Sequence, residues 1–313
     1  MQVHYFENGL PQFTNAVLTI GTFDGVHQGH QQVLQQLTDT AKKIQGESVL
    51  ITFHPHPRLV LKQTYQPIQT LTTLEEKLAL LKFYGVQHVV VVNFTEAFGN
   101  LTPAEYIEQF LVQNFRPHTI IIGYDHRFGA NREGNFTLLQ EKAAQFGYQV
   151  QQIAEHILRS ITISSTQIRA ALLDGNIHTA TELMAHKYTL IGKVVKGHQL
   201  GRTIGFATAN IAVTDTHKLV PGNGVYAVTV CLPKHENPTT FTAMMNIGVR
   251  PTVQGTNRTI EVHILNFDGD IYNEELQVTF HHKIRDEQKF ANLEALQQQL
   301  QHDKQTVEAY FAN

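Results

Sequence analysis

The sequence contains a single cysteine, Cys231, which excludes an internal disulfide bond. Such sparse use of cysteine is typical of proteins from a reducing compartment. Cys231 lies in a strand-like run over residues 225–232, where a small buried thiol is far more common than a nucleophile. We therefore assign Cys231 to packing rather than to chemistry.

The sequence also lacks a basic surplus and a long apolar run. The formal net charge is −3 and the pI is about 6.6, so the chain lacks the positive charge that nonspecific binding to nucleic acid needs. No run approaches the roughly 18 apolar residues of a membrane-spanning helix, and residues 1–12 do not have the pattern of a signal peptide. We expect a soluble, cytoplasmic protein without nucleic-acid or membrane partners.

The 313 residues, of which 42% are apolar, are enough for two domains. In the first half, short apolar runs alternate with helical spacing, which indicates a parallel α/β sheet with its ligands beyond the carboxyl ends of the strands. The expected strands are residues 17–20, 48–53, 88–94, 119–122 and 148–153. The expected helices are residues 31–44, 73–84, 103–115, 138–146, 165–173 and 177–185.

The pattern changes near residues 185–188, where we place the boundary between a domain of residues 1–185 and a domain of residues 186–313. From residue 188 to residue 283, apolar residues alternate with period two and are interrupted by glycine, proline and asparagine, which is typical of an antiparallel barrel. Helical spacing of apolar residues from Leu293 to Phe311 then predicts a trailing helix.

The most informative segment is residues 18–30, where an apolar strand breaks at Gly21 and two histidines, His27 and His30, follow at the start of a helical pattern. Unpaired N–H groups at a helix start carry about half a positive charge, which favours an anion. Histidines three residues apart can face the same way and donate to phosphate oxygens, and Gly29 between them leaves room for a nucleotide against the backbone. The segment therefore predicts a phosphate cradle.

The residues around the histidines agree with this prediction. Gly21 and Gly25 permit a tight turn from strand to helix, and Asp24 adds a carboxylate beside the expected anion site. Two other interpretations of the histidines stay open: a chance pair on a solvated helix face, or a pair of metal ligands. The metal interpretation lacks a third ligand nearby in the sequence.

Two further motifs follow expected strands. In residues 52–57, two prolines fix the backbone around His56, which suits either the wall of a site or a stiff surface turn. After the strand at residues 119–122, Asp125 can accept a hydrogen bond from a ribose or adenine donor and Arg127 can meet a phosphate. Asp125 can equally cap a turn.

A third motif, residues 163–169, places the hydroxyls of Ser164, Ser165 and Thr166 before a helix with Arg169 one turn in. Either one serine caps the helix, or hydroxyls, N–H groups and arginine together hold the outer phosphates of ATP. No residue of these motifs forms a covalent nucleophile with its base. Transfer of a nucleotidyl group needs mainly alignment and neutralisation of charge, for which hydrogen-bond donors suffice.

In the second half, residues 201–210 form a glycine-rich loop that ends in Thr208 and Asn210. In an extended segment these two side chains share a face and can offer oxygen ligands to magnesium, although a glycine-rich barrel corner would have the same composition. Glu261 alternates with Ile260 and Val262. If its face lines a pocket rather than solvent, this carboxylate can accept a hydroxyl proton during phosphoryl transfer.

These motifs, in this order, resemble the bifunctional riboflavin kinase/FAD synthetases of bacteria over nearly the whole chain. The resemblance to the adenylyltransferase half lies in residues 21–30, 53–57, 123–129 and 163–169. The resemblance to the riboflavin kinase half lies in residues 201–210, 221–227, 246–252, Glu261 and 285–290. The resemblance implies a Rossmann-like nucleotidyltransferase domain of α/β class and a riboflavin kinase barrel with a trailing helix.

The resemblance also implies a role for each motif. The catalytic residues would be Glu261, as base on the ribityl hydroxyl, and His27 and His30, on the ATP phosphates. Magnesium and phosphate would be held by Thr208 and Asn210. The residues expected to contact nucleotide are Gly21, Phe23, Asp24, Gly29, His56, Asp125, Arg127, Ser164, Ser165, Thr166, Arg169, Gly201, Arg202 and Gly205.

Two positions depart from the family pattern. His126 replaces an aromatic residue that often follows the aspartate, and Ala207 replaces the proline that usually precedes the threonine. Loss of a fixed φ at residue 207 is expected to loosen the loop by roughly 0.4–1 kcal/mol of ordering entropy.

The expected function is phosphorylation of riboflavin to FMN and adenylylation of FMN to FAD with release of pyrophosphate. ATP is the co-substrate of both reactions, Mg²⁺ is the expected metal, and flavin is substrate and product rather than a bound redox cofactor. Two alternatives stay open: an adenylyltransferase for another phosphorylated acceptor with a regulatory barrel, or a sensor that binds ligand without turnover.

Overall fold

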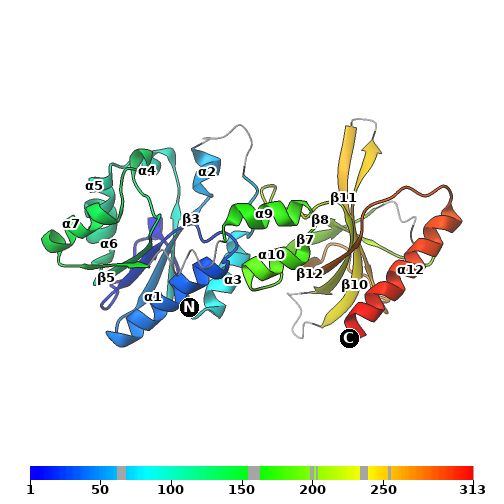
Figure 1. Cartoon of the computed structure of the whole chain (residues 1–313), viewed down its shortest axis with the longest axis horizontal. Helices are drawn as coiled ribbons and strands as arrows, with labels where there is room; N and C mark the ends of the chain where they lie inside the picture. Colours follow the sequence, from blue (N-terminus) through cyan, green and yellow to red (C-terminus); the bar gives the residue numbers. More distant parts are fainter. Residues whose placement is uncertain are drawn as a thin grey trace. The chain divides into compact units, whose positions relative to one another are not determined.

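The structure is a computed structural model that describes residues 1–61, 68–153, 163–197, 201, 204–232, 239–252 and 255–312. The chain divides into two compact units, Met1–Ser165 and Thr166–Asn313 (Figure 1). No helix of the described residues is long and apolar enough to cross a membrane.

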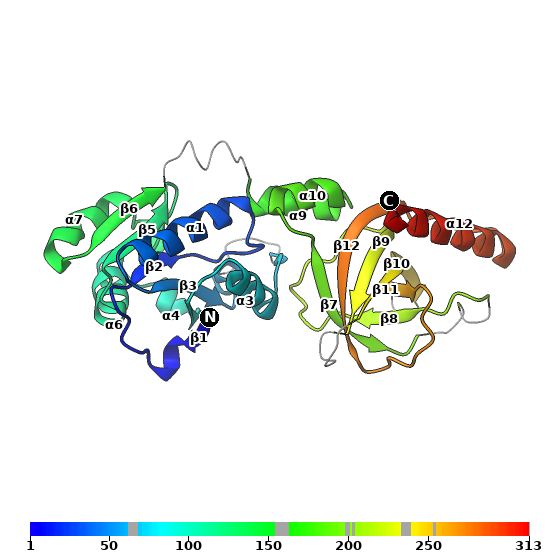
Figure 2. The same ribbon diagram turned by 90° about the horizontal axis from the view of Figure 1, so that it is seen from below.

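The first unit is built on a six-stranded sheet in the order β1-β4-β3-β2-β5-β6 (Figure 2). Every neighbouring pair of strands is parallel, as the alternating pattern predicts. The strands are β1 (Gln2–Tyr5), β2 (Val17–Ile20), β3 (Ser48–His54), β4 (His88–Asn93), β5 (Thr119–Gly123) and β6 (Gln149–Ile153). The edge strand β1 was not expected, because its four residues are largely exposed and carry no continuous apolar run.

Helices cover the sheet, and the period-two alternation of the strands supplies a core on each face. Leu18 and Ile51 belong to one core cluster with Phe110 and Leu139, whereas Val17 and Leu50 belong to another with Leu34 and Leu81. The helical elements are η1 (Phe6–Asn8), α1 (Gln28–Lys43), α2 (Pro57–Val60), α3 (Leu74–Phe83), α4 (Glu96–Gly99), α5 (Pro103–Glu105), η2 (Tyr106–Val112), α6 (Gln113–Phe115), η3 (Ala130–Arg132) and α7 (Phe136–Phe146).

The strand order contains a topological switch beside β2. From β2 the chain proceeds outward to β3 and β4, and β5 then pairs with the other side of β2. In open parallel sheets, ligands bind in the crevice beyond the carboxyl ends of the strands at such a switch. The loop after β2, which leads to His27, and the loop after β5, which carries Asp125 and Arg127, both begin at this edge.

The second unit contains a closed six-stranded barrel, in the order β10-β11-β8-β7-β12-β9, and confirms the predicted antiparallel architecture. Its elements are α9 (Ser165–Leu173), α10 (Ile177–Met184), β7 (Thr189–Val195), β8 (Ala209–Ala212), β9 (Gly224–Cys231), β10 (Thr240–Thr252), β11 (Gly255–Ile264), β12 (Glu275–Arg285) and α12 (Leu293–Ala312). The trailing helix α12 packs through Val307 on a cluster that includes Phe206, Ala227 and Met244 (Figure 1).

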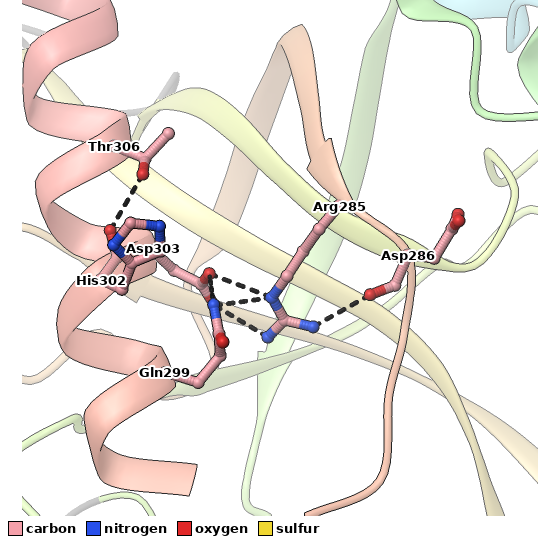
Figure 3. A network of polar contacts seen from close by, with 6 residues as sticks. All are labelled: Arg285, Asp286, Gln299, His302, Asp303 and Thr306. Carbon is pink, nitrogen blue, oxygen red and sulfur yellow. Dashed lines mark hydrogen bonds and ion pairs between the residues drawn. The ribbon is translucent and has the colours of Figure 1, made fainter. Parts of the chain in front are cut away.

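A buried ion pair also fixes α12 to the barrel. Asp303, which is fully buried, accepts hydrogen bonds from Arg285 Nε at 3.0 Å and Arg285 Nη2 at 2.8 Å (Figure 3). Gln299 Nε2 donates to the same carboxylate at 2.8 Å. Bidentate pairing of this kind attracts α12 to the barrel and also fixes the position of the helix.

Candidate active sites

The loop of residues 21–27, here named the cradle loop, has an unusual backbone. Phe23 has φ +47, Gly25 has φ +82 and Val26 has φ +39. Positive φ is a genuine outlier for a β-branched residue such as valine, and such strain persists only where the surroundings hold it. A Cβ atom on Gly25 would also lie 2.7 Å from Leu71 Cδ1. Glycine is therefore required at position 25.

Asp24 holds the cradle loop against the segment that precedes α3. Its buried carboxylate accepts hydrogen bonds from Leu71 N at 2.8 Å and Thr72 N at 3.1 Å, and Gly25 N donates to Thr72 Oγ1 at 3.2 Å. These bonds give Asp24 a structural role in the strained loop. Its expected contact with nucleotide stays a prediction.

His27 is the N-cap of α1, since its Nδ1 accepts a hydrogen bond from His30 N at 3.4 Å. The helix therefore begins at Gln28, three residues before the expected start. An accepting Nδ1 assigns the ring proton of neutral His27 to Nε2. This ring stacks on His30, with centroids 3.7 Å apart and an angle of 17° between the planes.

His30 is held in its neutral form. Burial, followed by the charges of His27 and Lys77, lowers the pKa of His30 well below its usual value. Its Nδ1 is buried and has no hydrogen-bond partner in the described part of the chain. An orphaned buried nitrogen beside a helix start is what a site prepared for a ligand group would leave.

Two glycines of the first motif make room for side chains. A Cβ on Gly29 would lie 3.3 Å from His27 Cε1, and a Cβ on Gly21 would lie 3.1 Å from Phe23 Cε2. Each glycine thus permits a close ring contact. This packing does not test the expected contact of Gly29 with nucleotide, which stays a prediction.

The structure links the third motif of hydroxyls to the cradle loop. Ser165, the first residue of α9, donates from Oγ to the carbonyl of Asp24 at 3.2 Å. Ser164 and Thr166 are exposed and Arg169 is half-buried. The hydrogen bond thus joins two residues, Asp24 and Ser165, that are far apart in the sequence.

The other two motifs end strands that neighbour β2. His56 caps α2 beyond β3, where its Nδ1 accepts from Arg58 N at 3.2 Å. Asp125 and Arg127 follow β5 and are exposed. Both motifs thus lie at the carboxyl edge that the switch point identifies.

Lys77 is a further polar residue near the cradle loop, and the sequence analysis missed it. It lies on α3 with 6% of its surface exposed, and its Nζ donates to Thr52 Oγ1 at 3.2 Å. Thr52 Oγ1 in turn donates to the carbonyl of Thr22 at 3.2 Å. A lysine in an amphipathic helix gives no sequence signal of burial, because the same pattern is usual on solvated faces.

In the barrel, pairing of three strands places three polar residues in one row. Glu261 of β11 lies opposite Asn210 of β8 on one side and Asn246 of β10 on the other. Directly opposed residues project from the same face of a sheet. Glu261 and Asn210 are both half-buried, whereas Ile260 and Val262 are buried from the opposite face.

The loop before β8 is packed closely on itself. A Cβ on Gly197 would collide with the amide of Asn210, and a Cβ on Gly201 would collide with the carbonyl of Phe206. Gly205 has φ +82, a conformation that favours glycine. Thr208 is half-buried in this loop, and Arg202 lies outside the described residues.

Comparison with known proteins agrees with this division of sites. A family model described as FAD synthetase matches residues 10–167, and one described as riboflavin kinase matches residues 184–311. The bifunctional riboflavin kinase/FMN adenylyltransferase of Escherichia coli (strain K12) is 41% identical over 295 residues, which cover 94% of this chain and 92% of that protein. The chain belongs to the bifunctional riboflavin kinase/FMN adenylyltransferase family.

Two other relatives extend the comparison. The bifunctional riboflavin kinase/FMN adenylyltransferase of Pseudomonas fluorescens is 34% identical over 311 residues, which cover 99% of this chain and 97% of that protein. A solved structure from Streptococcus pneumoniae, described as a macrolide-efflux protein, is 30% identical with a TM-score of 0.82 and covers 96% of this chain and 95% of that chain. The similarity thus spans both halves of this family member.

The structure explains how this member of the riboflavin kinase/FMN adenylyltransferase family accommodates His126. The ring stacks on Phe128 with centroids 6.1 Å apart, and Phe128 stacks on Tyr106 at 5.0 Å. Burial lowers the pKa of His126 to about 4, with smaller effects from Asp125 and Arg132, so the ring is neutral near pH 7. A neutral imidazole in this stack can replace the aromatic residue expected here.

The second departure, Ala207, is held by a histidine on the neighbouring strand. His263 Nδ1 lies 2.8 Å from the carbonyl of Ala207, so this nitrogen carries the proton and donates. The ring also contacts Phe206, with centroids 5.2 Å apart. His263 therefore ties the loop of Thr208 to the strand of Glu261 without help from a proline.

Proposed function

We propose that this chain adenylylates FMN at the cradle loop and phosphorylates riboflavin on the polar row of the barrel. The two activities are those of the family, whose models match residues 10–167 and 184–311. We place the functional boundary at residues 185 and 186. The riboflavin kinase model begins at residue 184, which supports this boundary, whereas the division into compact units falls earlier, between Ser165 and Thr166.

In the adenylyltransferase site, the chain would act by binding and orienting ATP. A phosphate oxygen of FMN attacks the α-phosphorus of ATP, and the bond to pyrophosphate breaks as negative charge grows on both fragments. His27 and the neutral His30 lie at the start of α1 and would donate to phosphate oxygens, and N–H groups of the helix end add to their effect. Preorganised donors of this kind stabilise developing charge without a covalent intermediate.

The other expected nucleotide-binding residues would complete this site. Ser165 is already bonded to the cradle loop, which supports a phosphate-binding role for its neighbours Ser164, Thr166 and Arg169. We propose nucleotide contacts for these further residues: Gly21, Phe23, Asp24, Gly29, His56, Asp125 and Arg127.

In the barrel, Glu261 would accept the proton of the ribityl hydroxyl while that oxygen attacks the γ-phosphorus of ATP and ADP leaves. Asn210 in the same row and Thr208 in the loop before β8 offer hard oxygen donors, and such donors together with ATP phosphates suit Mg²⁺. Magnesium, when bound, would neutralise phosphate charge. Gly201, Arg202 and Gly205 would contact the nucleotide from the loop.

The observation that carries the kinase assignment is the register that sets Glu261 opposite Asn210. The test incubates the full chain with riboflavin, ATP and Mg²⁺ and separates the flavins by chromatography. Glu261→Gln should lower FMN formation by about 10²–10⁴-fold, the usual contribution of a general base, and leave FAD formation from supplied FMN intact. Unchanged FMN formation would contradict the assignment of Glu261.

His30→Ala should have the reverse effect, so that FMN accumulates and FAD does not form. His178 on α10 is exposed, with 79% of its side chain accessible, and His178→Ala serves as the matched control. If His30→Ala still forms FAD at the normal rate, the ATP phosphates do not bind at the cradle loop. A barrel that only regulates would leave riboflavin unphosphorylated even in the unmodified chain.

We also propose that the protein works in the cytoplasm with small-molecule partners alone. The single cysteine and the net charge of −3 support this proposal. Cell fractionation that recovers the chain with membranes or nucleic acid would contradict it.

A further inference from the structure

Lys77 is a buried lysine to which the sites described above assign no role. Only 6% of its surface is exposed, although lysine is almost never buried unless it is paired. An ammonium group has three donors, and in the described part of the chain its one hydrogen bond is to Thr52 Oγ1. Two donors of a buried charge are therefore left for something that the fold itself does not supply.

The position of Lys77 links it to the cradle loop. Thr52 Oγ1, which accepts from Lys77, donates to the carbonyl of Thr22 within the segment between β2 and α1. The charge of Lys77 also reaches His30, whose pKa it lowers after the larger effects of burial and of His27. The ammonium is thus close enough to His30 to act on its charge.

The charged and titratable groups around Lys77 come from three elements. His30 interacts with it from α1 and Asp24 from the cradle loop, and Glu76 precedes it on α3; His27, the N-cap of α1, stacks on His30. Asp24 Oδ1 is already bonded to the backbone of Leu71 and Thr72, and Glu76 Oε2 accepts from Thr73 N at 2.9 Å in the capping box of α3. Both carboxylates therefore also accept hydrogen bonds from backbone N–H groups.

A buried ammonium with incomplete hydrogen bonding is unfavourable for the folded protein. Burial lowers the pKa of Lys77 to about 8 even though Asp24 acts to raise it. A residue that costs stability and sits beside an anion-binding helix start is more easily explained by a ligand than by the fold. The ligand must be an anion with several oxygen acceptors.

We propose that Lys77 binds phosphate oxygens of ATP and pyrophosphate in the adenylyltransferase reaction. This inference rests on the proposed ATP site at the cradle loop. The ammonium donates its two remaining N–H groups to the phosphates and opposes the charge that grows as the bond to pyrophosphate breaks. It supplies the full positive charge that the neutral His30 lacks.

The test compares Lys77→Met with Lys82→Met in the full chain, because Lys82 is exposed in the last turn of the same helix. Lys77→Met should reduce kcat/KM for ATP in FAD formation by about 10–100-fold, as expected for a lost charge-assisted bond. Lys82→Met should change nothing, riboflavin phosphorylation should be normal in both variants, and the melting temperature of Lys77→Met should be equal or higher.

Inhibition constants separate phosphate binding from a general disturbance of the site. In Lys77→Met, the inhibition constant of pyrophosphate should rise about tenfold or more, whereas that of adenosine, which has no phosphate, should not change. Equal weakening of both inhibitors, or a lower melting temperature together with lost activity, would show a structural role and overturn the proposal.

Normal FAD formation by Lys77→Met would also overturn it. His30→Ala distinguishes this failure from a failure of the proposed site. If His30→Ala abolishes FAD formation and Lys77→Met does not, the cradle loop stands and Lys77 has no role there. If neither variant has an effect, the ATP phosphates bind elsewhere and both proposals fail.

Discussion

Replacing Asp303 with alanine should destabilise the barrel unit strongly. The substitution removes a fully buried carboxylate that accepts hydrogen bonds from Arg285 and from Gln299 (Figure 3). The Arg285 side chain is 19% accessible, so its charge would be left mostly desolvated. Asp303 also anchors α12, whose Val307 packs on the cluster around Phe206.

The expected magnitude follows from this geometry. Removal of one partner from a buried ion pair typically costs about 3–5 kcal/mol. Arg285 keeps a hydrogen bond from Nη1 to the carbonyl of Asp286 at 2.9 Å and some contact with water, which favours the lower end of that range. For a domain of about 150 residues, roughly 3 kcal/mol corresponds to a fall in melting temperature of about 6–12 °C.

Differential scanning calorimetry of the full chain measures this change. Asp268 is exposed in the same unit, and Asp268→Ala is the matched control. Asp303→Asn, which keeps one oxygen acceptor but loses the charge, should fall between the unmodified chain and Asp303→Ala. A shift below about 2 °C for Asp303→Ala would refute the argument, because the carboxylate would then contribute no more than an exposed ion pair.

Three further changes test the two sites. Gly197→Ala would push a Cβ into the Asn210 amide, so the Mg²⁺ concentration needed for half-maximal kinase activity should rise several-fold. FAD formation from supplied FMN should not change. An unaltered Mg²⁺ requirement would count against Asn210 as a ligand. His263→Ala removes the donor to the Ala207 carbonyl and should raise the kinase KM for ATP several-fold. His263→Asn keeps a donor near the Nδ1 position and should recover most of the loss. Equal KM values for the two variants would argue against a role of the hydrogen bond. The pKa of Lys77 is about 8, and its charged form is the one that binds phosphate, so kcat/KM for ATP in FAD formation should fall as the pH rises through about 8. Lys77→Met should lack this fall. The same fall in both chains would assign it to another group.

Local patterns predicted most elements of the fold. Residues 17–20 form β2 and residues 165–173 form α9 as expected. These predictions depend on apolar spacing over a few residues, which is a property of the sequence itself. The start of α1 was placed three residues late, because the spacing of Val33 and Leu34 gives no sign that His27 caps the helix through its own side chain.

What the sequence determined by itself was the set of motifs, their order along the chain and the alternation that sorts strands from helices, because each depends on neighbouring residues. Only the tertiary structure decided that Ser165 meets Asp24, that Glu261 lies opposite Asn210 and that Lys77 is buried against Thr52. Each of these contacts joins residues distant in the sequence, and strand register and burial arise from the packing of the whole unit rather than from any local pattern.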